Sequence, residues 1–237
     1  MDKKKKRWKL AQNSETAWWR KQITYLKFDY FRKFSEELIK ELDNIFELTQ
    51  ETRILEIGSG PAGILTHLNS QKRFAVDPLE RFYCAQKACK EYRDPQVKYS
   101  SAQGEYLPFI DNCFDFLIID NILDHCEDID MFFQEAGRVL VPNGFIYLRN
   151  FTHTQWGIIF ARFLEIFKID RGHPYNFTKP GLQKLLQRNR FKTVKCKGYG
   201  FLKHFFHLIS ARKVSHYLRA LSFTQSDKVT FILVNEK

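Results

Sequence analysis

The stretch ILEIGSGPAGIL, residues 54–65, constrains the fold more than any other part of the chain. A short apolar run is followed directly by Gly58, Gly60 and Gly63, in the spacing G-x-G-x-x-G. The run predicts a buried strand, and the glycines predict a tight turn whose backbone can approach a ligand closely. A turn of this spacing after a strand is typical of a parallel α/β sheet that binds a dinucleotide.

Two residues in this stretch argue against a dinucleotide. Glu56 places a carboxylate in the strand where a pyrophosphate would lie nearby, and Pro61 removes a backbone N–H donor. S-adenosylmethionine shares the adenosine but carries a sulfonium and an ammonium group in place of phosphates. Glu56 suits those positive charges, and Pro61 removes nothing that such a ligand needs. The stretch therefore favours S-adenosylmethionine.

Short apolar runs alternate with helical patterns along most of the chain. We expect strands at 53–57, 73–77, 97–100, 114–120, 144–149 and 193–198 and in the terminal KVTFILVNEK. Helices are expected at 14–48, 63–68, 79–92 and 129–139, in TQWGIIFARFLEIFKI and in KPGLQKLLQRNRF. This alternation predicts a doubly wound α/β fold whose parallel strands end at one ligand-binding edge.

Four motifs occur in order: ILEIGSGPAG, AVDPLE, GEYLPFIDNCFDFLIIDNILDH and EAGRVLVPNG. Together they resemble the motifs of class I S-adenosylmethionine-dependent methyltransferases of the small-molecule type. The resemblance covers about residues 50–150. It implies a Rossmann-like seven-stranded sheet, mostly parallel with an antiparallel last strand, and added helices. The methyltransferase domain would span 49–237, with a cofactor half at 50–150 and a substrate half at 151–237.

The resemblance also implies which residues bind the cofactor. Asp77 would accept the ribose hydroxyls and Leu79 would pack on adenine. Gln103 stands where the family usually has an acid, and its amide can still accept from the adenine amine. The implied set is Glu56, Gly58, Ser59, Gly60, Gly63, Asp77, Leu79, Gln103, Gly104, Asp120 and Asn121, with the last two beside the methyl group.

Transfer from a sulfonium needs mainly an aligned nucleophile and the exclusion of water, so no covalent-nucleophile motif is required. Oxygen and nitrogen nucleophiles can also need a base. His125 is the best candidate base, although helix capping or packing is an equal alternative for it, and His173 is a weaker one. Candidates for substrate contact are Asp124, His153, Tyr175, Trp19 and Tyr25.

The net charge of +11 is concentrated in two segments. Residues 168–219 carry 13 Lys/Arg and one acid, and residues 1–9 form a smaller basic cluster. Residues 201–226 are expected to form a helical insertion. It would pack on the core, lie on anionic lipid through 201–223, or bind a phosphorylated or nucleic-acid substrate. Nucleic acid is the less supported partner, because no RNA-binding module is visible.

Residues 1–48 are expected to form a helical lid over the cofactor, with simple packing of an extra helix as the alternative. Five cysteines without a C-x-x-C pair support neither a disulfide framework nor a zinc site, and no metal is expected. No apolar run is long enough to span a membrane and no secretory signal is visible, so we expect a cytoplasmic protein, with peripheral membrane contact as an alternative.

The sequence thus predicts a methyltransferase that moves a methyl group to O, N or C of a small-molecule acceptor, apolar or membrane-associated acceptors included. Two alternatives stay open. One is an RNA methyltransferase that uses the basic segment 168–219. The other is a cofactor-binding scaffold without transfer activity.

Overall fold

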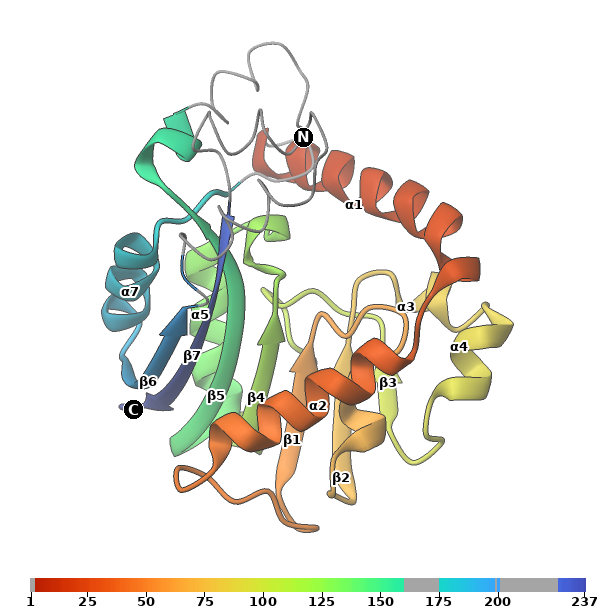
Figure 1. The fold of residues 1–237 in the computed structure, drawn as a ribbon, viewed down its shortest axis with the longest axis horizontal. Coiled ribbons are helices and arrows are strands. Elements are labelled where there is room, and N and C mark those ends of the chain that lie inside the picture. Colours follow the sequence, from red (N-terminus) through yellow and green to blue (C-terminus); the bar gives the residue numbers. More distant parts are fainter. Residues whose placement is uncertain (1–2, 160–174, 199, 201–225) are drawn as a thin grey trace.

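The computed structural model describes residues 3–159, 175–198, 200 and 226–237. Its centre is one sheet of seven strands in the order β3-β2-β1-β4-β5-β7-β6 (Figure 1). The strands are β1 (Arg53–Ile57), β2 (Lys72–Val76), β3 (Lys98–Ser100), β4 (Phe114–Asp120), β5 (Leu140–His153), β6 (Phe191–Gly198) and β7 (Ser226–Asn235). β1 to β5 pair in parallel, whereas β7 runs antiparallel to both β5 and β6. The expected mostly parallel sheet with an antiparallel last strand is confirmed.

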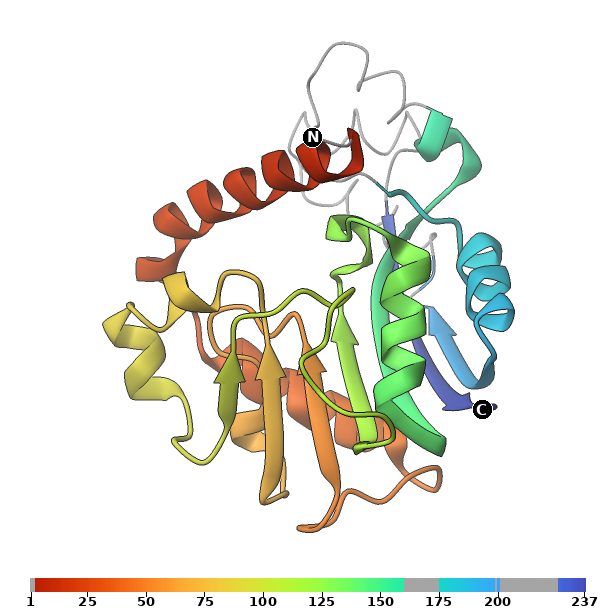
Figure 2. The same ribbon diagram turned by 180° about the vertical axis from the view of Figure 1, so that it is seen from behind.

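Helices cover both faces of this sheet, as Figures 1 and 2 show from opposite sides. The helices are α1 (Lys3–Gln22), α2 (Asp29–Leu42), α3 (Glu80–Tyr83), α4 (Lys87–Tyr92), α5 (Ile129–Val139) and α7 (Lys179–Arg188). α2 lies on one face, and α5 and α7 lie on the other. α1 lies apart from both layers and crosses over the carboxyl ends of the central strands (Figure 2).

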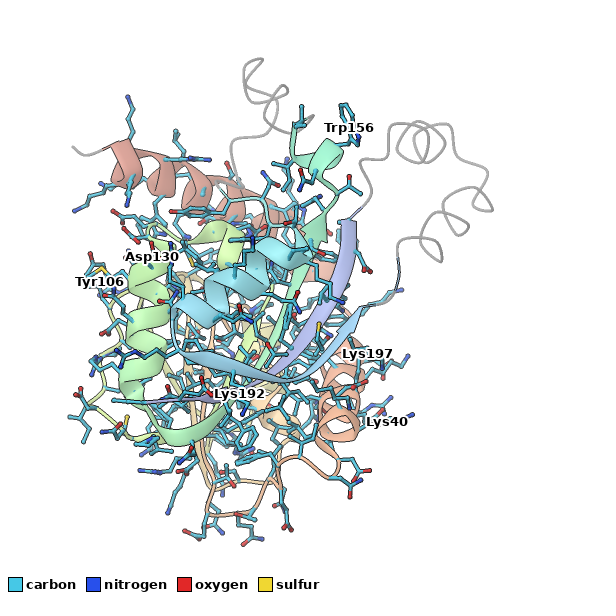
Figure 3. The ribbon with its side chains drawn as sticks, turned by 90° about the vertical axis from the view of Figure 1, so that its left-hand side faces the viewer. Lys40, Tyr106, Asp130, Trp156, Lys192 and Lys197 are labelled. Atoms are coloured by element: carbon cyan, nitrogen blue, oxygen red, sulfur yellow. The ribbon has the colours of Figure 1, made fainter. Side chains whose placement is uncertain are left out.

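The side chains of each strand alternate between two apolar clusters. On the α2 face, Phe34 and Leu38 pack with Ile54, Phe116 and neighbouring strand residues. On the opposite face, α5 and α7 pack against the intervening strand residues, which include Leu55, Leu117, Ile119 and Phe231. Burial on both faces explains why the sequence of these strands is almost continuously apolar. Ion pairs from Lys195 and Lys197 to Glu41 link β6 to α2, and Figure 3 shows Lys197 on the side of β6 near α2.

Three expected helices were wrong in extent. The N-terminal helix begins at Lys3 and ends at Gln22, and the chain then turns before α2 begins at Asp29. The turn arises because Leu26 is extended and packs inward, with Ile23 buried beside it. The expected helix 79–92 is interrupted, because Gln86 takes an extended conformation between α3 and α4.

Residues 63–68 form only the short 3-10 turn Leu65–His67 in place of the expected helix. The guanidinium of Arg73 donates to the carbonyls of Leu65 and Leu68 at 2.7 and 3.4 Å. The carboxylate of Glu56 accepts the Ile64 N–H. A helix of only six residues would leave these backbone groups without partners, and here side chains from neighbouring strands satisfy them and stabilise the tight turn.

Part of the expected substrate half lies outside the described residues. The helix expected in 154–169 is described at 155–159, where it is helical. The expected insertion 201–226 lies outside them except for Ser226, which begins β7. Among the helices that the structure describes, none combines the length and apolar character needed to cross a membrane.

Candidate functional site

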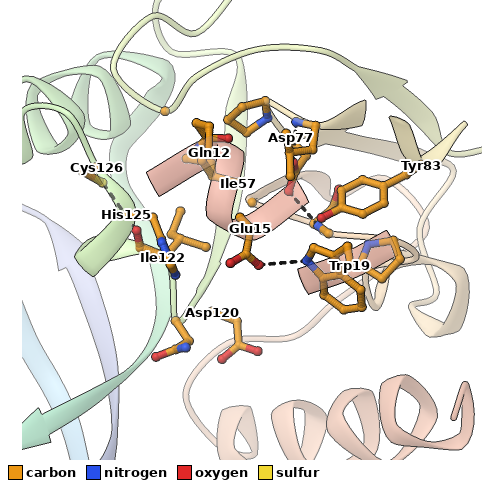
Figure 4. A pocket seen from close by; sticks show the side chains of 18 of the residues that line it. Gln12, Glu15, Trp19, Ile57, Asp77, Tyr83, Asp120, Ile122, His125 and Cys126 are labelled. Carbon is orange, nitrogen blue, oxygen red and sulfur yellow. Dashed lines mark hydrogen bonds between the residues drawn. The ribbon is translucent and has the colours of Figure 1, made fainter. Parts of the chain in front are cut away.

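A cavity of about 530 Å³ lies at the carboxyl ends of the strands, between the sheet and α1 (Figure 4). Its floor is formed by the ends of β1, β2, β4 and β5 and the start of β7, and its cover by Trp8, Gln12, Glu15 and Trp19 of α1. Its volume is in the range of small-molecule and cofactor sites. The cavity therefore occupies the edge where open α/β sheets bind their ligands.

The glycine turn after β1 is held in one conformation from two sides. Gly58, Gly60 and Gly63 have φ of +76°, +59° and +67°, a region that favours glycine. On the sheet side, the Gly58 N–H donates to the Val76 carbonyl at 2.7 Å. Behind the turn, the Arg93 guanidinium donates to the carbonyls of Pro61 and Gly60 at 3.0 and 3.2 Å. The turn is therefore shaped before any ligand arrives.

Glu56 lies beneath this turn and is 4% exposed. Its carboxylate oxygens accept the Ile64 N–H at 3.0 and 3.2 Å. Burial raises the pKa of Glu56 to about 8. The side chain closes the turn from inside and lies outside the cavity lining, so its expected contact with the positive charges of the ligand stays a prediction.

Asp77 follows β2 and lines the cavity. Its two carboxylate oxygens accept the N–H groups of Gly60 and Leu79, each at 2.8 Å. Burial raises the pKa of Asp77 to about 6. A carboxylate has further lone pairs on both oxygens, so Asp77 can also accept the two hydroxyls of a ribose. Leu79 is next to it in the lining.

Gly104 also lines the cavity and lies next to Ile57 at the end of β1. A Cβ at this position would lie 2.3 Å from the Phe132 ring, so only glycine fits. Gln103 lies outside the lining, and its carbonyl accepts the Tyr106 N–H at 3.1 Å.

Asp120 at the end of β4 is held by a buried arginine. The Arg149 Nε and Nη2 atoms donate to the two Asp120 oxygens at 2.6 and 2.7 Å. Arg149 is 1% exposed, donates to the Tyr30 hydroxyl at 2.8 Å and lies 3.4 Å from the centre of the Phe34 ring. Asn121 has φ +52° and donates its N–H to the Arg149 carbonyl at 2.7 Å. The end of β4 is thereby fixed against β5.

Of the candidate catalytic and substrate residues, His125 and Trp19 line the cavity. His125 ends the 3-10 turn Leu123–His125, and its Nε2 is 3.8 Å from Oδ1 of Asp124. Asp124, His153, Tyr175 and Tyr25 lie outside the lining. The Tyr175 hydroxyl donates to the Glu127 carbonyl at 3.1 Å, and the backbone N–H of His153 donates to the Phe177 carbonyl. Tyr25 is 79% exposed. His173 lies outside the described residues.

The cavity thus brings together ten of the expected residues, which are Gly58, Ser59, Gly60, Asp77, Leu79, Gly104, Asp120, Asn121, His125 and Trp19. Glu56, Gly63 and Gln103 are not part of the lining. The lining also contains charged and polar residues that the sequence analysis missed, among them Glu15, Tyr30, Tyr83, Glu105, Arg149 and Lys228. For Arg149 a signal existed, since it is a charged residue within the apolar strand FIYLRNF.

Comparison with known proteins identifies the family. Residues 55–148 match the family model described as a methyltransferase domain. A curated relative, the ubiquinone/menaquinone biosynthesis C-methyltransferase UbiE of Rickettsia typhi, is 32% identical over 170 residues, which cover 67% of this chain and 63% of the relative. Residues 55–148 are therefore a methyltransferase domain of the class I S-adenosylmethionine-dependent kind. Its cofactor is S-adenosylmethionine.

A second curated relative and a solved structure are also similar to this chain. The mitochondrial arginine-hydroxylase NDUFAF5 of Rattus norvegicus is 30% identical over 138 residues, which cover 56% of this chain and 38% of that protein. The chain thus spans less than two thirds of the length of these curated relatives. Phosphoethanolamine N-methyltransferase 2 of Haemonchus contortus, solved with phosphomonomethylethanolamine and S-adenosylhomocysteine, shares the fold. Its TM-score is 0.61 at 15% identity, over 85% of this chain and 53% of that one.

Proposed function

We propose that this chain transfers the methyl group of S-adenosylmethionine to O, N or C of a small-molecule acceptor in the cavity beneath α1. The observation that carries the proposal is the arrangement of the cavity. It places the glycine turn, Asp77 and Leu79 on one side, and Asp120, Asn121 and His125 on the other. One side fits a cofactor and the other leaves room for an acceptor.

The residues present fit this cofactor. The turn offers close backbone approach at Gly58 and Gly60, and Asp77 has acceptor capacity left beyond its two backbone bonds. Glu56 and Gly63 support the turn from behind. When bound, S-adenosylmethionine supplies a methyl group already activated by its sulfonium. The task of the chain is then to align the acceptor and exclude water.

Exclusion of water falls to α1 and the aromatic side chains of the cavity, and we propose α1 as the working part of the expected lid at 1–48. The Trp19 ring lies edge-on to Tyr83 with ring centres 5.8 Å apart, and its indole N–H donates to Glu15 at 2.8 Å (Figure 4). Near the other end of the helix, Lys4 pairs with Asp128 at 2.6 Å. The remainder of 1–48 includes α2, which packs in the core of the methyltransferase domain.

An acceptor with an apolar body is supported by the lining, to which Trp8, Trp18, Phe31, Phe132 and Phe151 contribute. The name of the Rickettsia typhi relative, a ubiquinone/menaquinone biosynthesis enzyme, points in the same direction. For acceptors that must lose a proton, His125 is the proposed base, because it lines the cavity and the other described candidate, His153, does not.

The scaffold alternative stays open beside the proposed transfer. The Rattus norvegicus relative is named for a hydroxylation, so the shared domain does not by itself fix the reaction. The RNA alternative rests on the basic segment 168–219, of which the structure describes 175–198 and 200. Peripheral membrane contact through 201–223 stays a proposal. Liposome flotation of the protein with and without that segment tests it.

The proposal is tested by incubating the protein with methyl-labelled S-adenosylmethionine and fractions of a cell extract. We expect label in a small-molecule fraction, and partition of that label into an organic phase if the acceptor is apolar. Label in RNA would favour the nucleic-acid alternative. Tight cofactor binding without label in any fraction would favour the scaffold.

A further inference from the structure

The face of the sheet beneath α2 changes character step by step along β5 and β7. Directly opposite pairs in an antiparallel ladder point to the same face. Tyr147 and Ile232 form an apolar pair within the core, and Arg149 and Thr230 form a buried polar pair two residues further on. The next pair on this face is Phe151 and Lys228. Both members of this pair line the cavity, so at Lys228 this face of the sheet leaves the core and borders the ligand space.

The charge of the neighbouring Arg149 is already neutralised. Both oxygens of Asp120 accept from its guanidinium, Glu37 lies 3.4 Å from its Nη1, and the Tyr30 hydroxyl accepts from Nη2. A buried guanidinium with two carboxylate partners and a hydroxyl already has its charge and its N–H donors satisfied, so it needs no anion from a ligand.

Lys228 has no such compensation. Within the part of the chain that the structure describes, its ammonium has neither a hydrogen bond nor an ion pair. The charged groups that act on it are Arg149 from β5, Asp120 from β4 and Glu37 from α2. Burial lowers the pKa of Lys228, and Arg149 lowers it further, while Asp120 and Glu37 act in the opposite direction. A half-buried cation of this kind is stabilised by an anion that enters the cavity.

We propose that Lys228 binds an anionic oxygen of the acceptor, so that the acceptors of this methyltransferase are carboxylates, phosphates or phenolates rather than neutral molecules. The inference rests on the proposed function, and it names the acceptor class of the same cavity. Lys228 and Phe151 lie beyond Asp120 and Asn121, on the side of the cavity away from Asp77. The aromatic ring would contact the apolar body of the acceptor while the ammonium pairs with its oxyanion.

The test uses the full-length protein saturated with S-adenosylhomocysteine, and calorimetric titration with benzoate, phenyl phosphate and 4-nitrophenolate. Benzamide is the neutral probe of similar shape. We expect at least one oxyanion to bind at least tenfold more tightly than benzamide. Lys228→Met should reduce that affinity by about 10- to 100-fold, as expected for a bond to a charged group. Lys192→Met is the matched control, because Lys192 is exposed on β6 and does not line the cavity (Figure 3).

In Lys228→Arg, the pH dependence of oxyanion affinity separates a binding role of Lys228 from a purely structural one. In the wild type the oxyanion affinity should fall as pH rises through the lowered pKa of Lys228, because the ammonium is lost. In Lys228→Arg the affinity should persist to higher pH, since a guanidinium stays protonated. Which probe binds best distinguishes carboxylate, phosphate and phenolate acceptors.

Equal binding of all probes to wild type and Lys228→Met would overturn the inference, as would the absence of oxyanion binding to wild type at millimolar concentration. Failure of S-adenosylhomocysteine itself to bind would instead count against the proposed function. The two failures are therefore distinguishable in one set of titrations.

Discussion

Among single residues, Gly60 and Gly63 share a left-handed backbone but differ in their surroundings. A Cβ on Gly60 would meet nothing within 4 Å, whereas a Cβ on Gly63 would lie 2.4 Å from Oε2 of Glu56. The Glu56 carboxylate cannot move away freely, because it is buried and accepts the Ile64 N–H. The two glycines therefore separate the cost of backbone strain from the cost of collision with the carboxylate.

Gly60→Ala should lower the free energy of unfolding by about 1–2 kcal/mol, the cost of a left-handed alanine. Gly63→Ala should lower it by about 1–3 kcal/mol more, the usual cost of forcing extra atoms into a packed site. Urea denaturation of both variants at one pH measures the difference. Equal losses in the two variants would show that Glu56 does not pack against Gly63 as described.

Asp77 gives a pH-dependent prediction. Its folded pKa of about 6 is above the unfolded value of 3.8, so its ionisation costs stability as pH rises between about 4 and 6. Ribose hydroxyls donate to the ionised form and lower that pKa. Affinity for S-adenosylmethionine should therefore fall by up to about tenfold between pH 6 and pH 5.

Asp77→Asn should weaken binding at neutral pH by about 10- to 100-fold and remove this step in the pH profile. Calorimetric titration at several pH values measures both effects. Asp111→Asn is the control, since Asp111 is a 64% exposed carboxylate that lies outside the cavity lining. A variant Asp77→Asn that binds as tightly as wild type would remove the ribose assignment.

Among the elements, α1 contributes little to the core and much to the cavity. Ala11 is its buried apolar residue, whereas Trp8, Gln12, Glu15, Trp18 and Trp19 all line the cavity. A helix that buries so little of itself is expected to open at a low free-energy cost. This is the physical basis for treating α1 as the lid.

Trp19→Ala removes the edge-on contact with Tyr83 of α3 that holds the lid down, together with a bond to Glu15 that lies within α1 itself. We expect S-adenosylhomocysteine to dissociate at least tenfold faster, with a change in unfolding free energy below about 1 kcal/mol. Stopped-flow displacement measures the dissociation rate, and Trp156→Ala, which alters a 72% exposed side chain outside the lining, is the control. An unchanged dissociation rate would leave α1 as a packed extra helix.

At the scale of the whole molecule, the features predicted correctly from sequence are those that depend on local patterns. The buried strand and left-handed glycines around Gly58 follow from adjacent residues, and so do Asp77 at the end of β2 and the apolar alternation that builds the sheet. The 3-10 turn after Gly63 was missed because it is stabilised by Arg73, a residue of the next strand, whose guanidinium donates hydrogen bonds to the carbonyls of the turn. Lys228 was missed because its position is set by the β5–β7 register, which no local pattern specifies.

The central claim is that the cavity under α1 binds S-adenosylmethionine, and calorimetric titration of the full-length protein tests it most directly. We predict saturable one-to-one binding in the micromolar range, weakened by Asp77→Asn and unchanged by Asp111→Asn. The absence of binding at millimolar cofactor, with the protein shown to be folded, would contradict the account.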